Sequence, residues 1–243
     1  MGPEVWLRGT GYVASLVREY GLGVCTVHQS LLRISPSGRG PNRILDATNA
    51  GLELGCPCVV IHVPFETRWD CPEAQRWVRT VESCRERTSG TGTRLALENP
   101  VVASAVDRPG VLSQLPVLTE FAKRNDLGIA FDTCHAGTQE IELLDAYDLI
   151  RDLLVDIHLS DLCSATSART HYWQDPFRAH RMPGEGSLPL AGFLSRLAED
   201  DFQGPLTIEV SPIALRFWSR RQLRRRLARA ADYALRAIEC SSS

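Results

Sequence analysis

Short apolar runs rich in β-branched residues alternate along the chain with longer segments whose apolar residues recur at helical spacing. The short runs predict strands near residues 3–8, 24–29, 57–63, 94–99, 128–133, 154–159 and 205–210. The longer segments predict helices near residues 10–20, 41–54, 72–88, 111–125, 139–150, 189–199 and 220–239. Strands that alternate with helices are typical of βαβ units. The pattern therefore predicts an α/β fold with a parallel sheet.

The number of predicted strands suggests an incomplete barrel. Seven strands are predicted, whereas a closed TIM-type (β/α)8 barrel needs eight. The chain opens with Met1-Gly2-Pro3, almost directly inside the first predicted strand. We therefore expect one barrel domain over residues 1–243 that lacks its first strand and helix, through a late start site, a truncation or variation within its family. Because an open barrel exposes strand edges, a homodimer that covers them is a further expectation.

The last predicted helix, residues 220–239, carries the clearest end signal. Ser219 followed by Gln222 forms a capping box. The apolar positions that recur at helical spacing are Leu223, Leu227, Ala231, Ala234 and Ile238. Arginines crowd the stretch 220–226. We interpret them as the solvated outer face of a barrel helix, with a nucleic-acid patch as the alternative.

Composition and charge narrow the class of protein. A hydrophobic fraction of 44% and a charged fraction of 23% are those of a soluble globular protein. A net charge of −2 argues against nucleic-acid binding. The eight cysteines follow no signal peptide and form no metal or redox motif, so we expect a reducing cytoplasm. The apolar stretches are too short to span a membrane, so no membrane partner is expected.

Six of the predicted strands end in a histidine or an acidic residue. The segments CTVHQ, VVIHVP, LALENP, IAFDTCH, VDIHLSD and LTIEVSP carry, in this order, His28, His62, Glu98, Asp132 with His135, His158 with Asp161, and Glu209. A buried strand accounts for the apolar run but not for the polar side chain at its end. The carboxyl ends of parallel barrel strands surround one axis. We therefore expect these side chains to converge on one site.

Four of these residues predict a metal centre. They end four successive strands and are Glu98, Asp132, His158 and Glu209. Three carboxylates packed together would repel one another and raise each other's pKa, and a divalent cation removes that problem. Three oxygen donors and one imidazole suit one Mn²⁺ ion, with Mg²⁺, Co²⁺ and Zn²⁺ as alternatives.

The chain resembles the xylose isomerase-like barrel superfamily. The matching pieces are LALENP, GIAFDTCHAG, DIHLSD, HRMPGEG and GPLTIEVSP, and the resemblance runs from about residue 4 to residue 212. That superfamily contains sugar isomerases and epimerases, inosose and dehydroshikimate dehydratases, and type IV apurinic endonucleases. Five motifs in the right order identify the superfamily, but they do not identify a substrate.

The resemblance also assigns roles to individual residues. It implies that Glu98 and Glu209 are metal ligands that also transfer protons. It implies that the substrate is contacted by His62, His135, His180 and Arg181. His28 matches a further histidine of the pocket. Asp161 would orient His158 or cap the next segment, and Glu185 in the PGEG turn would be structural.

These roles fit isomerisation or epimerisation of a small sugar or polyol-like substrate. The reaction removes a proton next to a carbonyl group, which is only weakly acidic in water. A metal that bridges the carbonyl and hydroxyl oxygens would stabilise the enediolate as a Lewis acid. One carboxylate would remove the proton, contributing about 10²–10⁴-fold, and a second on the other face could return it. An arginine would stabilise the developing negative charge.

Three alternatives remain. A dehydratase or lyase of the inosose or dehydroshikimate type starts with the same proton abstraction. A type IV apurinic endonuclease uses a three-metal cluster, but Arg178 stands where that family has an aspartate, and arginine cannot ligate a cation. A non-catalytic relative is the third. Substrate specificity would lie in loop residues such as Trp69, Trp173 and Phe177, which carry no readable code.

Overall fold

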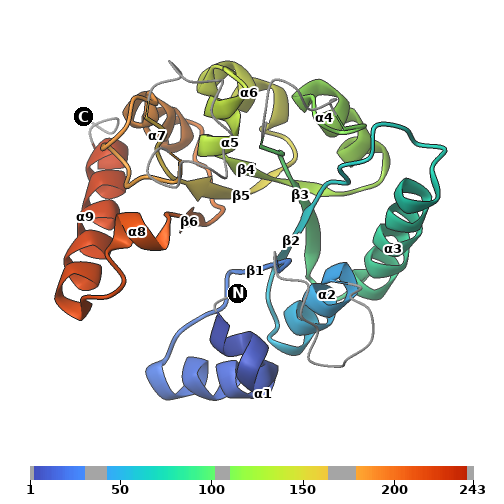
Figure 1. Cartoon of the computed structure of the whole chain (residues 1–243), viewed down its shortest axis with the longest axis horizontal. Coiled ribbons are helices and arrows are strands. Elements are labelled where there is room, and N and C mark those ends of the chain that lie inside the picture. The colour runs from blue at the N-terminus through green and yellow to red at the C-terminus, as the bar shows by residue number, and fades with distance from the viewer. Residues whose placement is uncertain (1–2, 31–42, 102–109, 164–178, 240–243) are drawn as a thin grey trace. The chain divides into compact units, whose positions relative to one another are not determined.

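The computed structural model describes residues 3–30, 43–101, 110–163 and 179–239, with side chains from residue 9 onward. Within these ranges six strands form one sheet in the order β1-β2-β3-β4-β5-β6 (Figure 1). They are β1 (Thr26–His28), β2 (Cys58–His62), β3 (Arg94–Glu98), β4 (Gly128–Asp132), β5 (Leu154–Leu159) and β6 (Leu206–Ile208). The pairings of β1 with β2, β2 with β3, β3 with β4 and β5 with β6 are parallel.

Helices connect the strands. They are α1 (Pro3–Tyr20), α2 (Arg43–Glu53), α3 (Pro72–Thr88), α4 (Leu115–Arg124), α5 (Thr133–Thr138), α6 (Leu143–Ile150), α7 (Leu190–Glu199), α8 (Pro212–Leu215) and α9 (Arg220–Glu239). None of the helices in the described residues is both long enough and apolar enough to cross a bilayer. A strand that is followed by a helix and then by a parallel strand is the repeating unit of (β/α) folds.

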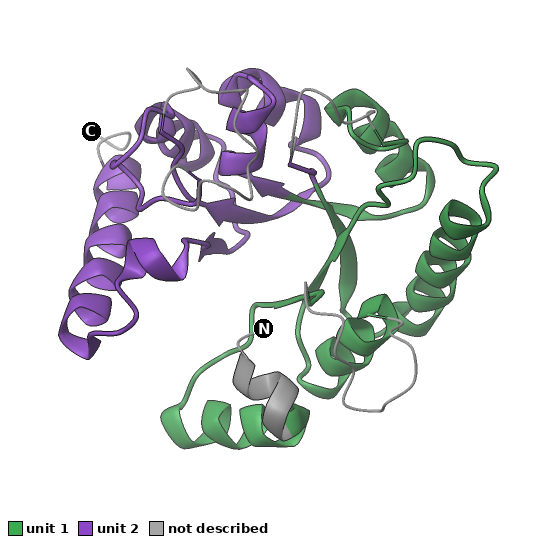
Figure 2. Cartoon of the chain, in the orientation of Figure 1, with its two compact units in different colours: residues 1–98, 109–130 green, residues 99–108, 131–243 purple. Residues whose placement is uncertain are grey.

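The chain divides into two compact units (Figure 2). Residues 1–98 and 109–130 form the first unit, and residues 99–108 and 131–243 form the second. In the first unit α2 packs against β1, β2 and α3, and α3 packs against β3. In the second unit α5 packs against β5 and α6, and α7 packs against α6 and α9.

Both units have apolar interiors. Val59, Ile61 and Leu97 are fully buried in the first unit. Ile157 and Phe193 are fully buried in the second. Long apolar runs without alternation are what strands covered on both faces require, and this explains why the apolar pattern located the strands so well.

The strand predictions between residues 24 and 210 are confirmed to within two residues at each end. The strand predicted near residues 3–8 is wrong. Residues 3–20 form α1, which is interrupted at Gly9, where φ is 77° and ψ is 170°. A short apolar run fits a strand and a helix equally well. Pro3 at the first position suits a helix, because the backbone N–H that proline lacks has no partner there anyway.

Two helix predictions also need correction. The helix predicted near 139–150 is α6, which begins at Leu143. A separate short helix that was not predicted, α5, precedes it, and Asp132 caps α5 by accepting a 2.8 Å hydrogen bond from the backbone N–H of His135. The helix predicted to begin at residue 111 begins at Leu115.

The bounds of α9 are confirmed, and Ser219 caps it, with Oγ 3.4 Å from the backbone N of Gln222. The residues of its apolar stripe are only partly buried, however. Ala234 is buried and Leu223 and Ile238 are half-buried, whereas Leu227 is 41% exposed and Ala231 is exposed. Ala230, outside the stripe, is buried. Helical spacing alone does not fix which positions the packing partner, here α7, covers.

Candidate functional site

Three polar side chains stand at the carboxyl ends of adjacent strands in the first unit. His28 ends β1, His62 ends β2 and Glu98 ends β3. Glu98 is buried, and its Oε2 lies 3.4 Å from His28 Nε2 and 3.2 Å from His62 Nε2. The two imidazole rings meet edge to face, 4.8 Å apart. Two histidines therefore face one buried carboxylate oxygen.

The hydrogen bonding of His28 indicates which of its nitrogens carries a proton. Nδ1 lies 2.7 Å from the carbonyl oxygen of Gln29. A carbonyl oxygen only accepts, so Nδ1 must be the donor, and in the neutral ring Nε2 presents a lone pair to Glu98. A lone pair and a carboxylate oxygen repel each other unless a proton or a cation lies between them. Metal-ligating histidines commonly donate their other N–H to a carbonyl group in this way.

Gln29 and Trp77 hold this part of the first unit and were missed in the sequence. The buried Gln29 side chain accepts a 3.0 Å hydrogen bond from the backbone N–H of His62, and Gln29 N–H donates to the carbonyl of Val60 at 2.8 Å. Trp77 Nε1 donates to the carbonyl of His62 at 3.0 Å. The only sequence signal for Gln29 is its place directly after His28.

Asp132 is the centre of the corresponding group in the second unit. Its side chain is 0% exposed, and Oδ1 accepts the cap hydrogen bond of α5. Within the described ranges Oδ2 is buried and accepts no hydrogen bond. His135 Nε2 and His180 Nδ1 each lie 3.9 Å from Oδ2. Leaving a buried polar atom unsatisfied costs about 1–3 kcal/mol, so this oxygen is a site at which a cation would be stabilised.

Asn99 sets the geometry around Asp132. Its side-chain amide donates to the carbonyl of Asp132 at 3.0 Å and accepts from the backbone N–H of Asp132 at 2.7 Å. The Asn99 carbonyl lies 2.9 Å from His135 Nδ1. Nδ1 is therefore the donor, and Nε2 of the neutral ring turns its lone pair toward Asp132, as His28 does toward Glu98. Asn99 was missed because nothing in the sequence separates it from an ordinary loop residue.

His180 approaches Asp132 from the loop that precedes the PGEG turn. Its backbone has a φ of 45°, and its Nδ1 lies 3.0 Å from Ser160 Oγ and 3.1 Å from the carbonyl oxygen of Glu209. Cys134 completes a group with Asp132 and His180 that could hold a metal ion. Burial, and then the charge of Asp132, raise the pKa of the Cys134 thiol. The neutral thiol is a poor ligand, so His180 is the better donor.

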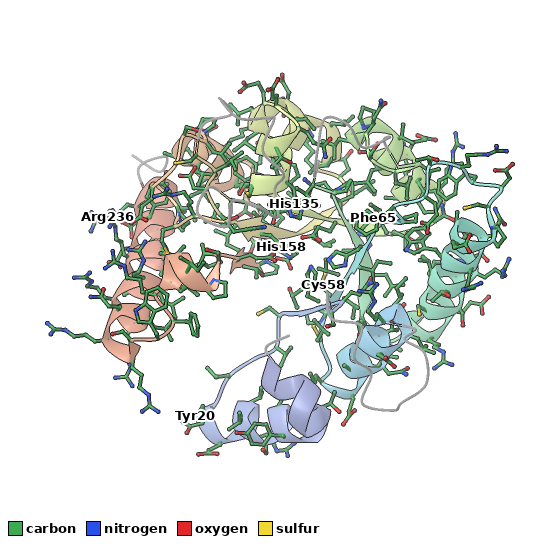
Figure 3. The ribbon with its side chains drawn as sticks, in the orientation of Figure 1. Tyr20, Cys58, Phe65, His135, His158 and Arg236 are labelled. Atoms are coloured by element: carbon green, nitrogen blue, oxygen red, sulfur yellow. The ribbon has the colours of Figure 1, made fainter. Side chains whose placement is uncertain are left out.

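His158, labelled with His135 in Figure 3, lies between two carboxylates. Its Nδ1 is 2.7 Å from Glu209 Oε2, and its Nε2 is 3.5 Å from Asp156 Oδ2. His158 and Asp156 are buried, whereas the Glu209 side chain is 38% exposed. Donors at about 2.1 Å from one ion and at right angles to each other are about 3 Å apart. The spacing of His158 and Glu209 therefore suits two ligands of one ion.

Asp161 serves the loop and not His158. Its carboxylate accepts four backbone hydrogen bonds of 2.8–3.1 Å, from Leu162, Gly184, Gly186 and Leu188. The expectation that it caps the next segment is met, and the alternative that it orients His158 is wrong, because Asp156 contacts that ring. Asp156 was missed, although period-two spacing puts residues 156 and 158 on one face of a strand.

The PGEG turn is anchored to α9. Glu185 pairs with Arg226 at 2.6 Å and with Arg229 at 3.1 Å. Gly184 has a φ of 80° and packs against the ring of Tyr233. Glu185 is thus engaged in structure, as expected. Arg226 is only 12% exposed and is not part of a solvated face.

Arg181 and Trp69 both have partners in the structure. Arg181 pairs through its backbone with Asp161, and its guanidinium donates to Cys163 Sγ at 3.3 Å. Trp69 stacks on Phe121, with centroids 5.4 Å apart, so it supports α4 and does not lie free in a specificity loop. Trp173, Phe177 and Arg178 lie outside the described residues, so the expectations attached to them stay predictions.

Comparison with known proteins places the chain in a family. An uncharacterized protein of Mycobacterium leprae is 27% identical over 252 residues, covering 92% of this chain and 82% of that protein. The crystal structure of 3-keto-D-glucoside 4-epimerase from E. coli is similar at a TM-score of 0.62, with 18% identity over 94% of this chain and 86% of that one. A probable 3-DHS dehydratase from Bacillus anthracis is similar at a TM-score of 0.59, with 12% identity over 84% and 77%.

Because these two crystal structures have less than 25% sequence identity to the chain, their similarity shows only a common fold. The family described as xylose isomerase-like TIM barrel matches residues 11–238, nearly the whole chain. The order of strands and helices agrees with that description. The chain therefore belongs to the xylose isomerase-like TIM barrel family.

Proposed function

We propose that the protein is a divalent-metal-dependent isomerase or epimerase of a small sugar or polyol-like hydroxy-carbonyl compound. One observation carries the proposal. His135 donates from Nδ1 to the carbonyl of Asn99, so its Nε2 lone pair is directed at a buried oxygen of Asp132 that no described group satisfies. A cation bound between the two atoms would remove the repulsion between the lone pair and the carboxylate oxygen. Family membership and the likeness in fold to a sugar epimerase support the same conclusion.

The residues that would hold the ion are Glu98, Asp132, His158 and Glu209, each within one residue of the carboxyl end of a strand. Mn²⁺ is the ion we propose, with Mg²⁺, Co²⁺ and Zn²⁺ as alternatives. When bound, the ion supplies a Lewis acid for the negative charge that develops on the substrate's oxygens.

Glu98 and Glu209 are the proposed proton carriers. One carboxylate removes the proton next to the carbonyl group, and the other returns a proton to the opposite face, which inverts that centre. Such general acid–base transfer contributes about 10²–10⁴-fold to the rate. The half-exposed Glu209 is accessible to a substrate, whereas the buried Glu98 is held between His28 and His62.

Four residues would orient the substrate. His62, His135, His180 and Arg181 are the proposed substrate contacts, through hydrogen bonds to hydroxyl oxygens. The geometry of His28 and His62 also suits metal ligation, since both direct Nε2 at Glu98. The number of ions per chain, measured by mass spectrometry of the purified protein, distinguishes these roles. We expect one ion, and a value of two or three would favour the metal-cluster chemistry of the apurinic endonucleases.

A dehydratase is the second candidate. The likeness in fold to the Bacillus anthracis protein favours it, and the first step, removal of a proton next to a carbonyl, is the same. The outcome differs because the proton does not return to carbon: the hydroxyl group on the neighbouring carbon leaves, takes up a proton and departs as water, and a C=C bond forms. The protonation state of the group that faces this hydroxyl would decide between the two outcomes.

Proton NMR in D₂O tests both candidates together. The protein is incubated with Mn²⁺ and a panel of ketoses, inosose and hydroxypyruvate, with an abasic oligonucleotide in a parallel well. Exchange of the α-proton for deuterium reports abstraction, new epimer signals identify an epimerase, and loss of the signal of a CH–OH group identifies a dehydratase. We expect exchange that disappears in Glu209→Gln. Absence of exchange with every substrate and metal, or cleavage of the oligonucleotide alone, would overturn the proposal.

A further inference from the structure

Asp156 is a buried carboxylate that the proposed reaction does not use. It lies within β5, two residues before His158, and its side chain is 0% exposed. A charged group is taken out of water only where its contacts compensate for the lost hydration. Its contacts therefore indicate its role.

Each oxygen of Asp156 has a different neighbour. Oδ1 accepts a 3.0 Å hydrogen bond from the hydroxyl of Thr207 on β6. Oδ2 lies 3.5 Å from His158 Nε2. Thr207 is paired in register with His158, so the three side chains are held by two adjacent strands. Strand geometry, and not a loop, sets the position of the carboxylate.

The opposite nitrogen of the ring faces the site. His158 Nδ1 is 2.7 Å from Glu209 Oε2. A carboxylate oxygen only accepts, so without an ion Nδ1 donates to Glu209; once an ion takes the Nδ1 lone pair, the remaining ring proton is on Nε2, and that proton needs an acceptor. In the second unit Asp156 is the carboxylate on that side of the ring.

We propose that Asp156 is a positioning residue that accepts the Nε2–H of His158 and thereby fixes the ring with Nδ1 toward Glu209. The inference rests on the proposed function, which makes His158 and Glu209 ligands, and adds a residue that touches neither ion nor substrate. His28 and His135 have backbone carbonyls in the equivalent position. A carboxylate makes a stronger hydrogen bond than a carbonyl and makes the ring a better donor.

Asp156→Asn tests the proposal with little change in shape, because asparagine can still accept from Thr207. Asp152→Asn is the matched control: it removes the same charge from an exposed position just before β5. Titration calorimetry with MnCl₂ should show a dissociation constant raised about 10–100-fold in Asp156→Asn and unchanged in Asp152→Asn. Thr207→Val, which frees the carboxylate on one side, should give a smaller loss.

A second readout needs no metal. In metal-free protein labelled with ¹⁵N-histidine, the ring signals of His158 should shift or broaden in Asp156→Asn and stay in place in Asp152→Asn. If wild type binds none of the four ions, the proposed metal chemistry fails while these ring signals still decide the role of Asp156. Ring signals or Mn²⁺ affinity in Asp156→Asn equal to wild type would overturn the inference.

Discussion

A Cβ atom on Gly186 would lie 2.2 Å from Asp161 Oδ1. The backbone N–H of Gly186 also donates to Oδ2 of the same carboxylate at 2.9 Å. Only glycine allows the main chain to approach a side chain so closely. The turn that follows His180 and Arg181 therefore depends on the carboxylate at position 161 and on the absence of a side chain at position 186.

Gly186→Ala should lower the free energy of unfolding by about 1–3 kcal/mol, the usual cost of overpacking. The clash includes the carbonyl oxygen of Leu162, 2.5 Å from the added atom, which cannot rotate away. Gly192→Ala is the control, since nothing lies within 4 Å of its Cβ position in α7. It should stabilise by about 0.5–1 kcal/mol. Urea unfolding of both variants measures the difference, and equal stabilities would contradict it.

Arg226→Met should destabilise the protein by about 1–3 kcal/mol, because among the described residues it leaves the largely buried Glu185 carboxylate with only the exposed Arg229 as its partner. Arg221→Met is the control: Arg221 is exposed on the same helix, so its loss should change stability by no more than about 0.5 kcal/mol. Thermal unfolding compares the two. A loss confined to Arg221→Met would mean that the pair does not anchor the PGEG turn.

Removal and return of metal should change the melting temperature. After treatment with EDTA, Mn²⁺ at about 100 times its dissociation constant should stabilise the protein by about 2.7 kcal/mol. Asp132→Asn should abolish this gain, because it removes a charge from the oxygen we assign to the ion, whereas exposed Glu86→Gln should keep it. If none of Mn²⁺, Mg²⁺, Co²⁺ and Zn²⁺ raised the melting temperature, the proposed metal centre would be refuted.

Glu98→Gln and Glu209→Gln should each abolish turnover, since an amide can neither remove nor return the proton. The resemblance gave a substrate contact to His62 and only a place in the pocket to His28, but their Nε2 atoms lie at similar distances from Glu98. We therefore expect His28→Ala and His62→Ala to reduce kcat/KM by similar factors. Steady-state kinetics on the substrate found in the NMR screen checks this. Full activity of His28→Ala would show that the two histidines do not have equivalent roles.

Stability should decline on the alkaline side. Burial raises the pKa of the Cys84 thiol above its ordinary value of 9.0, so the folded protein holds this proton more tightly than the unfolded chain. This tighter binding contributes to the stability of the fold in full at pH values below the pKa of the thiol in the unfolded chain, and the contribution is lost as pH rises above that pKa. Melting temperatures measured from pH 8 to pH 11 should fall beyond about pH 9. The slope should be smaller in Cys84→Ala, and an identical slope would count against this assignment.

Local signals in the sequence located most elements correctly. Strands buried on both faces need continuous apolar runs, so β2 and β4 were visible as such. The cap at Ser219 was visible because it depends on neighbouring residues only. Residues 3–8 were misread because their short apolar run suits a strand and a helix alike, and packing decides between them.

The same limit applies to the candidate site. Residue type and strand-end position singled out Glu98, Asp132 and His158 without any structure, because a polar group at the end of a buried strand has no structural reason to be there. They did not show that Asp156 faces His158, or that Asp161 belongs to the loop, because both are aspartates close to the same histidine. Which partner each meets depends on the pleat of β5 and on a turn some 25 residues further along the chain.

By itself, then, the sequence determined the alternation of strands and helices and the residue types at the strand ends, since both follow from local periodicity and chemistry. Tertiary structure alone decided the hydrogen-bond partners of His28 and His135, the partner of His158, and the lack of a hydrogen bond to Asp132 Oδ2 within the part of the chain that the structure describes. These depend on hydrogen bonds between atoms of distant residues. No local pattern encodes such bonds, because they form only when separate elements of the chain have packed.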